Sequence, residues 1–326
     1  MEQSLKWGII GCGDVTEVKS GPAFNLAPRS ALVAVMRRNG KKAEDYAKRH
    51  GVPRWYDDAE RLISDPDVNA IYIATPPSSH LEYAIRALKA GKFVYMEKPM
   101  AMNTEEARKI SQITKQYKAK LSVAHYRRAQ PMFQKIKHLL AQNVIGPVRF
   151  VSLKMLQPAG SDLFAQSEEN WRVNPAISGG GLFHDLAPHQ LDLMSHFFGK
   201  VSQAHGFALN QASLYPADDL VTGELLFEKG ITFQGTWCFT VPPEEKTDCC
   251  DILGAKGKIS FPVFGHKIQL SHEGKSQTIR FAPLPHVQQP MIEKVCAFFL
   301  GDGPNPCSAD DAIVSMEIMD AFTNPH

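Results

Sequence analysis

The segment from residue 179 to residue 192 contains side chains that can transfer protons. Asp185 and His189 are four positions apart, so they share one face if the segment is helical. An imidazole has a reference pKa of about 6.5, and it can accept a proton in one direction of a reaction and return it in the other. A carboxylate one turn away can orient the ring or bind a neighbouring hydroxyl group. The spacing therefore indicates acid–base chemistry.

The same region also offers ligands for a metal ion. His189, Asp192 and His196 would lie on one helical face. A catalytic zinc site usually needs a ligand set with an open position and supporting hydrogen bonds behind the ligands. No second cluster in the sequence is able to complete such a set. We therefore predict that no metal is bound.

A glycine-rich turn follows the first apolar run of the chain. Gly11 permits a tight turn, and Gly13 lets the backbone approach a pyrophosphate. A helix that begins at Asp14 and Val15 would offer free N–H groups and a positive dipole end to that anion. Thr16 stands where this fingerprint usually has Gly or Ala. We predict that a dinucleotide binds here; the alternative is a tight turn without a ligand.

Two arginines end the second apolar run. An NAD-selective site usually has an acid there, whereas Arg37 and Arg38 suit a 2′-phosphate. Lys41 and Lys42 follow, and guanidinium matches the geometry of phosphate. We predict NADP(H) as the preferred cofactor, with NAD(H) as the alternative. Alternatively, these basic residues form a solvent-exposed loop that binds no ligand.

The elements that must position these residues alternate between apolar runs and amphipathic stretches. The apolar runs are 6–10, 31–36, 70–74, 93–96 and 121–124, and the helix-like stretches are 15–26, 41–49, 79–90 and 104–117. Buried strands alternating with helices are typical of an α/β fold with a doubly wound parallel sheet. We therefore predict a Rossmann domain over residues 1–125.

The alternation of apolar runs and amphipathic stretches ends after residue 125. Helices are predicted at 131–142 and 188–198, successive strands between 201 and 281, and two helical segments at 291–300 and 310–322. Residues 231–239 alternate apolar and polar positions, which is typical of a strand with one wet face. We predict an α+β domain with a large, mostly antiparallel open sheet over residues 126–326, serving substrate binding and oligomerisation.

Three further segments carry a family resemblance. They are Ala74-Thr75-Pro76-Pro77-Ser78-Ser79-His80, then Glu97-Lys98-Pro99, then Trp171-Arg172 followed by the glycines and the Asp-x-x-x-His spacing of residues 179–192. In this order they resemble the glucose–fructose oxidoreductase/inositol dehydrogenase (Gfo/Idh/MocA) family over nearly the whole chain. One departure is Ala187-Pro188, where the family commonly has Gly and a variable residue.

The resemblance implies an NAD(P)-dependent oxidoreductase that acts on the CH–OH groups of sugars, inositols or related polyols. In such proteins the Lys of Glu-Lys-Pro and the Asp and His of Asp-x-x-x-His meet beside the nicotinamide. The matching catalytic residues here are Lys98, Asp185 and His189. The peptide before Pro99 is often cis in the family. Relatives also pair their open sheets, which implies a homodimer or homotetramer.

Residue chemistry agrees with these roles. Oxidation of a secondary alcohol needs a base for the O–H proton while hydride leaves the carbon, and His189 can be that base. Lys98 can donate a hydrogen bond to the same oxygen and stabilise developing alkoxide charge. It follows the fifth strand, at the edge where open α/β sheets bind ligands.

Further contacts are predicted around both groups. The other cofactor contacts are Thr75, Pro76, His80, Glu97 and Lys98, and the substrate contacts are Lys98, Tyr126, Trp171, Arg172, Asp185 and His189. His80 is equally well explained as a helix cap, and Tyr126 and Trp171 are equally well explained as packing residues.

Two other functions fit the same resemblance. Some relatives hydrolyse glycosides with a tightly bound, recycled NAD, and Arg37 argues mildly against that function. A non-catalytic cofactor sensor is expected to lose the lysine or the histidine, and Lys98 and His189 are both present.

Composition excludes several other classes. The 326 residues are 44% hydrophobic and 21% charged, and a net charge of +2 does not favour binding to nucleic acid or a membrane surface. That total combines 20 basic against 14 acidic side chains in residues 1–125 with 16 against 20 in residues 126–326. No apolar window reaches the roughly 18 residues of a membrane span, and no secretory signal is visible. Six cysteines without a CxxC pair predict reduced thiols in a cytoplasmic protein.

Overall fold

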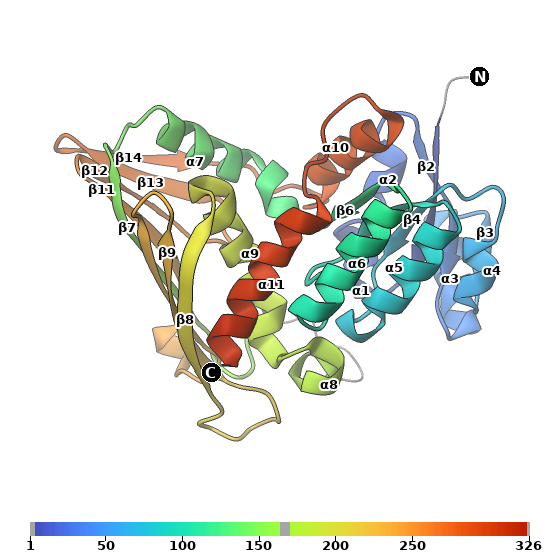
Figure 1. Ribbon diagram of the computed structural model, residues 1–326, viewed down its shortest axis with the longest axis horizontal. Helices are drawn as coiled ribbons and strands as arrows, with labels where there is room; N and C mark the ends of the chain where they lie inside the picture. The colour runs from blue at the N-terminus through green and yellow to red at the C-terminus, as the bar shows by residue number, and fades with distance from the viewer. Residues whose placement is uncertain (1–3, 164–169, 325–326) are drawn as a thin grey trace. The chain divides into compact units, whose positions relative to one another are not determined.

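A computed structural model describes residues 4–163 and 170–324 of the chain (Figure 1). The chain divides into two compact units, residues 1–130 with 284–313, and residues 131–283 with 314–326. Residues 126–130 and 284–313 belong to the predicted second domain, whereas the structure groups them with the first unit. Long-range hydrogen bonds contribute to this grouping. The Lys120 Nζ, for example, donates to the carbonyl oxygens of Phe298 and Phe299 (3.1 and 2.8 Å).

The first unit contains a six-stranded sheet in the order β3-β2-β1-β4-β5-β6, and its strand pairs are parallel. Its strands are β1 (Leu5–Ile10), β2 (Ser30–Met36), β3 (Arg54–Tyr56), β4 (Ala70–Ile73), β5 (Phe93–Met96) and β6 (Leu121–Val123). The apolar runs form these strands because both faces of the sheet are buried. This strand order confirms the predicted Rossmann fold, in which ligands bind at the carboxyl edge near the β1/β4 reversal.

The helices of the first unit connect and flank these strands. They are α1 (Asp14–Val18), α2 (Ala23–Leu26), α3 (Gly40–His50), α4 (Ala59–Ile63), α5 (His80–Lys89), α6 (Thr104–Gln116) and α10 (Gln289–Leu300). Figure 1 shows α5 and α6 lying side by side. The single helix predicted at 15–26 is wrong: it is broken at Gly21, where a Cβ would lie 2.2 Å from the Thr16 carbonyl oxygen. The short elements β3 and α4 were not predicted.

The second unit contains an eight-stranded sheet in the order β14-β13-β12-β11-β7-β10-β9-β8. Its strands are β7 (Val148–Leu156), β8 (Val201–Leu209), β9 (Leu220–Phe227), β10 (Thr232–Cys238), β11 (Thr247–Gly254), β12 (Gly257–Phe261), β13 (Lys267–His272) and β14 (Lys275–Arg280). Only the β7–β10 pair is parallel among the pairs described, so the predicted mostly antiparallel sheet is confirmed. Strand β7 was not predicted, although it lies inside the sheet.

One face of this sheet is covered by helices (Figure 1). They are α7 (Pro131–Ala141), α9 (Gly181–Phe198) and the part of α11 (Ala309–Thr323) that follows residue 313; α8 (Pro175–Ser178) precedes α9. On that face Phe322 packs against the backbone of Gly206 and Gly223, where a Cβ would lie under 3 Å from the Phe322 side chain. Helix α9 begins seven residues before the predicted start and continues through Pro188, so Asp185 lies inside it.

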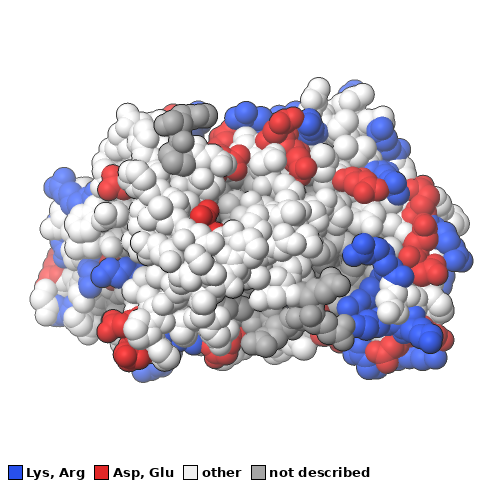
Figure 2. Space-filling view, turned by 90° about the horizontal axis from the view of Figure 1, so that it is seen from below, with Lys and Arg blue, Asp and Glu red and all other residues white. Residues whose placement is uncertain are grey.

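Figure 2 shows charged side chains of both signs toward the edges of one face, whose middle is mostly uncharged. Ion pairs between residues four apart lie on or next to helices of the first unit, and they include Lys48–Glu44, Arg61–Asp57 and Arg86–Glu82. Such exposed pairs add little to stability. No helix within the described residues is both long and apolar enough to span a membrane.

Candidate functional site

The glycine turn lies between β1 and α1. Gly11 has a φ of +94°, and a Cβ there would lie 2.9 Å from the backbone nitrogen of Thr75, so this position requires glycine. Its N–H and that of Cys12 donate to the Met36 carbonyl oxygen, which joins the turn to the end of β2 (2.9 and 3.1 Å). Among the atoms of the described residues, a Cβ on Gly13 would meet only the Gly11 oxygen, at 4.0 Å, so none of them requires glycine there. A ligand that approaches the backbone closely at this position would explain why it is glycine.

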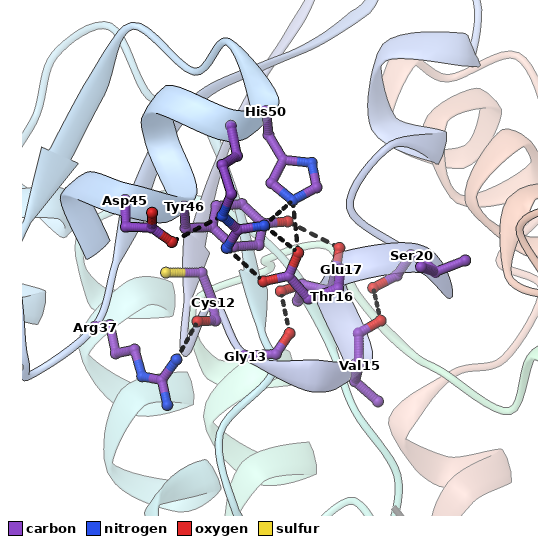
Figure 3. Close-up of polar contacts among 12 residues, drawn as sticks. Cys12, Gly13, Val15, Thr16, Glu17, Ser20, Arg37, Asp45, Tyr46 and His50 are labelled. Carbon is purple, nitrogen blue, oxygen red and sulfur yellow. Dashed lines mark hydrogen bonds and ion pairs between the residues drawn. The ribbon is translucent and has the colours of Figure 1, made fainter. Parts of the chain in front are cut away.

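Arg37 lies beside this turn (Figure 3). It follows β2 directly, and its Nη1 is 3.5 Å from the Cys12 carbonyl oxygen. Asn39 then caps α3, because its side-chain oxygen accepts from the backbone N–H of Lys42 (3.1 Å). The cap starts the helix immediately after Arg37 and Arg38, so the basic residues gather at one end of α3.

The loop after β4 is connected to the segment after β5 by His80. Its Nε2 lies 2.8 Å from the Thr75 carbonyl oxygen, and its Nδ1 lies 3.0 Å from the Pro99 carbonyl oxygen. The ring is fully buried, and burial lowers the pKa of His80. The described geometry is thus a bridge between the two loops, while direct contacts of His80, Thr75 and Pro76 with a cofactor remain predictions.

Glu97 is the centre of a buried hydrogen-bond network at the end of β5. Its carboxylate accepts from the Tyr72 hydroxyl, from Gln288 Nε2 (2.6 Å) and from the backbone N–H of Lys98 (3.2 Å). The Tyr95 hydroxyl donates to Gln288 Oε1 (3.1 Å). Because a buried carboxylate needs such donors, the network holds the backbone that carries Lys98. The Lys98–Pro99 peptide is cis, as expected.

Helix α9 places Asp185 and His189 one turn apart in the second unit. Arg172 Nε lies 3.2 Å from Asp185 Oδ2, and the Arg172 guanidinium carbon lies 4.5 Å from the Trp171 ring centroid. The aromatic ring and the carboxylate therefore hold one nearly buried guanidinium between them. This geometry supports a positioning role for Arg172 toward Asp185.

His189 is almost fully buried and packs against an aromatic ring. Its imidazole lies 5.7 Å from the Phe264 ring, with the planes at 80°. The Asp248 carboxylate accepts from the backbone N–H groups of Val263 and Phe264 (2.9 and 2.6 Å), which holds the turn that presents this ring. These contacts restrict the orientation of the imidazole.

Tyr126, the remaining predicted substrate contact, lies in the first unit. It begins a short 3-10 helix (Tyr126–Ala129), is largely buried, and has the Arg127 guanidinium 5.5 Å from its ring centroid. Its contact with substrate remains a prediction. Among residues 4–163 and 170–324, no group of three or more His, Cys, Asp or Glu side chains is placed to hold a metal ion.

His184, next to Asp185, makes stability depend on pH. Burial lowers its pKa to about 4, against the opposing effect of Asp320. Below pH 6.5 the unfolded chain therefore binds a proton that the folded chain does not, and the free energy of unfolding falls as the pH drops toward 4. We expect this residue alone to lower it by about 3 kcal/mol across that window. Urea unfolding at pH 7 and at pH 4 measures the change.

The variant His184→Gln should show a correspondingly smaller decrease over the same pH range. His205→Gln is a matched control because His205 is exposed on β8, so this variant should keep the wild-type decrease. An unchanged pH dependence in His184→Gln would contradict the assignment.

Sequence comparisons place the chain in a family. A model for the GFO/IDH/MocA oxidoreductase family, NAD-binding Rossmann fold, matches residues 5–125, and one for the GFO/IDH/MocA C-terminal domain matches residues 133–260. Oxidoreductase P35 of Formosa agariphila is 48% identical over 322 residues, 99% of either chain. The chain belongs to the Gfo/Idh/MocA family. The predicted resemblance is confirmed, and this Gfo/Idh/MocA protein is an NAD(P)-dependent oxidoreductase.

Solved structures share the Gfo/Idh/MocA fold. Aldose–aldose oxidoreductase from Caulobacter crescentus, complexed with glycerol, has a TM-score of 0.85 at 24% identity, covering 98% of this chain and 96% of that one. Levoglucosan dehydrogenase, in complex with NADH and levoglucosan, has a TM-score of 0.85 at 22% identity, with 98% and 96% coverage. At these identities the likeness shows the fold.

Sequence reasoning missed several residues around the candidate site of this Gfo/Idh/MocA protein. Gln288 contacts Glu97 from a segment 191 residues later in the chain, and Phe264 and Asp248 lie far from His189 in sequence. No local pattern could have identified them, because their roles depend on long-range packing.

Proposed function

We propose that this protein interconverts a hydroxyl and a carbonyl group on a sugar, inositol or related polyol, with NADP(H) as its cofactor. The observation that carries the proposal is the arrangement on α9, where Asp185 and His189 lie one turn apart, the carboxylate paired with Arg172 and the imidazole packed on Phe264. The two structural neighbours are complexes with glycerol and with levoglucosan, which supports a polyhydroxylated substrate.

The first unit fits a dinucleotide. The open space beside Gly13 accepts a pyrophosphate against the backbone, and Arg37 stands next to it to bind a 2′-phosphate. The nicotinamide, when bound, supplies or accepts the hydride at the substrate carbon. NAD(H) remains the alternative cofactor, since levoglucosan dehydrogenase binds NADH.

The side chains move the proton and bind the substrate oxygens. In the oxidation direction, His189 takes the hydroxyl proton as hydride leaves the same carbon, and in reduction it returns that proton. Lys98 donates a hydrogen bond to the reacting oxygen and stabilises negative charge that develops there. Asp185, Trp171 and Arg172 would bind neighbouring hydroxyl groups and the sugar face. Lys98 and His189 thus serve one hydride-transfer step.

A panel of aldoses, ketoses and inositols, assayed by NADPH absorbance in both directions, tests the proposal. We expect net cofactor turnover with at least one polyol. Cleavage of a chromogenic glycoside without net NADPH change, by protein that retains its cofactor, would instead support the glycoside hydrolase function. Cofactor binding without any turnover would support the sensor.

Arg37→Ala should shift cofactor preference. A guanidinium–phosphate pair contributes about 1.5–3 kcal/mol, so loss of Arg37 should raise the Kd for NADPH by about 10- to 100-fold and leave the Kd for NADH within about threefold. Fluorescence titration measures both constants. Arg86→Ala is a matched control, because Arg86 pairs with Glu82 on α5. Equal weakening of NADPH and NADH would contradict a 2′-phosphate contact.

We further propose that the second unit mediates oligomerisation through the sheet face opposite α9. Phe207 on β8 is 70% exposed and Phe150 on β7 is 45% exposed, and the alternation of buried residues along both strands places them on this face. A dimer or tetramer would cover these rings. A monomer mass by light scattering at micromolar concentration would contradict this.

A cytoplasmic location is also proposed. The six cysteines, which all lie within the described residues, form no disulfide. Reduced thiols are typical of the cytoplasm. Recovery of the protein in a membrane or secreted fraction would contradict the proposal.

A further inference from the structure

The glycine turn is followed by a helix that is too short to hold the turn by itself. Helix α1 has five residues, and isolated helices of that length are unstable. Within it, Thr16 replaces the usual small residue: its Oγ1 donates to the Gly13 carbonyl oxygen (2.7 Å), which also accepts from the Thr16 N–H (2.9 Å). The turn is therefore closed locally and is joined to the end of β2 through the Met36 carbonyl oxygen, whereas the short helix that follows it needs contacts from another element.

Helix α3 supplies the first connection, through Tyr46. Its hydroxyl donates to the Thr16 carbonyl oxygen (2.8 Å), which also accepts from the Gly21 N–H (3.1 Å). Tyr46 is buried, and burial raises its pKa to about 12, so the hydroxyl keeps its proton at neutral pH. A carbonyl freed by the early end of α1 is thus satisfied from α3.

Glu17 supplies the second connection (Figure 3). Its two oxygens accept from Arg49 Nη1 and Nη2, each at 2.8 Å, and His50 Nε2 lies 2.8 Å from Oε2. Arg49 is itself held by Asp45, whose Oδ2 accepts from Nε (2.7 Å). The hydrogen bonds from Arg49 hold the pKa of Glu17 at about 2, so the carboxylate is charged at all ordinary pH values. We call the contacts of Tyr46, Arg49 and His50 with Thr16 and Glu17 the α3 clamp.

The segment that leads into α3 contacts the glycine turn itself. Arg37 lies three residues before the helix begins, and its guanidinium lies against the Cys12 carbonyl oxygen. The turn is therefore contacted by the arginine expected to bind a 2′-phosphate, and the residues that follow the turn are contacted by α3.

We propose that the α3 clamp sets the position of the glycine turn relative to Arg37, so that a single NADP(H) molecule is held at its pyrophosphate and its 2′-phosphate together. The proposal rests on the proposed cofactor. Two contacts on one ligand reinforce each other only when their spacing matches that ligand. The clamp residues are positioning residues and do not themselves touch the dinucleotide.

Titration of Glu17→Gln with three ligands tests the proposal. NADPH spans both contacts, ADP carries only the pyrophosphate, and 2′-AMP carries only the 2′-phosphate. We expect the Kd for NADPH to rise by about tenfold, with the Kd of each fragment within about twofold of wild type, because only the linked ligand depends on the spacing. The KM for NADPH should rise by a similar factor, and added NADPH should restore turnover.

Tyr46→Phe provides a second, conservative variant that removes one hydrogen bond and keeps the ring, and it should show the same pattern at smaller amplitude. Asp67→Asn is the matched control, since it breaks a 2.8 Å ion pair with Arg54 elsewhere in the same unit. Its NADPH affinity should equal that of wild type.

The possible outcomes separate the proposals. Clamp variants that fold, as judged by circular dichroism, and bind NADPH like wild type would overturn the inference. Equal weakening of ADP and NADPH would also overturn it, because the clamp would then shape the turn alone. A wild-type protein that binds no NADP(H) would instead refute the proposed cofactor.

Discussion

Replacing Lys98 by methionine should lower kcat by about 100- to 1,000-fold, the usual effect of removing one donor from developing negative charge. Lys98 follows β5 at the carboxyl edge of the parallel sheet, and its backbone N–H is bound by the buried Glu97 carboxylate. Methionine keeps the length of the apolar stem and removes only the ammonium group. The Kd for NADPH should therefore change by less than about threefold. Stopped-flow measurement of a single turnover gives the rate, and fluorescence titration gives the Kd.

Two comparisons make this result specific to Lys98. Lys89→Met removes an exposed lysine from the end of α5 and should retain wild-type kcat. Added ammonium should partly restore the Lys98→Met rate, because the space vacated by the substitution is that of the ammonium group. A kcat equal to wild type in Lys98→Met would remove the residue from the mechanism.

Replacing His189 by asparagine should lower kcat/KM by about 100- to 10,000-fold, the range for loss of an acid–base group. Asparagine keeps a hydrogen-bonding side chain but cannot take up the hydroxyl proton. The imidazole is buried against Phe264 on a helix that is continuous from Gly181 to Phe198, so the substitution should leave the fold intact. The limb of the pH–rate profile that belongs to the imidazole should disappear. Steady-state kinetics from pH 5 to pH 9 would show this.

His196→Asn on the same helix is the control and should retain its activity and its pH profile. An equal loss in His196→Asn would contradict the assignment of the acid–base role to His189. A double variant of Lys98 and His189 should lose little more than the worse single variant, because residues that serve one step are not additive. Full additivity would contradict their joint role.

Much of the first unit follows from local chemistry. Short apolar runs such as 70–73 and 93–96 that alternate with amphipathic stretches are typical of strands buried on both faces, and a glycine turn after the first strand of the chain is typical of a dinucleotide site. The proximity of Asp185 and His189 is also predictable from the local sequence, since a four-residue spacing places two side chains on one helical face. These features depend on neighbours in the chain, so the pattern of residues is enough to predict them.

Other elements depend on context that a local pattern does not contain. The break between α1 and α2 comes from Gly21, which is required by the close approach of the Thr16 carbonyl and Tyr46. Strand β7 lies inside a sheet beside β10, its partner from some 80 residues later, and its alternation of buried and exposed positions becomes clear only once that sheet is known. Helix α9 tolerates Pro188 because a single lost backbone hydrogen bond is offset by burial of most of the helix.

The sequence by itself therefore determined the family, the Rossmann and open-sheet fold, and the chemical identity of the candidate catalytic groups, because each is carried by short motifs that can be recognised one by one along the chain. Only the tertiary structure decided how those groups are held. Gln288 behind Glu97, Phe264 against His189, and the α3 clamp on Glu17 are contacts between distant segments. These contacts stabilise the protein only in the folded chain, where the burial of many other groups has offset the entropy cost of bringing the distant segments together.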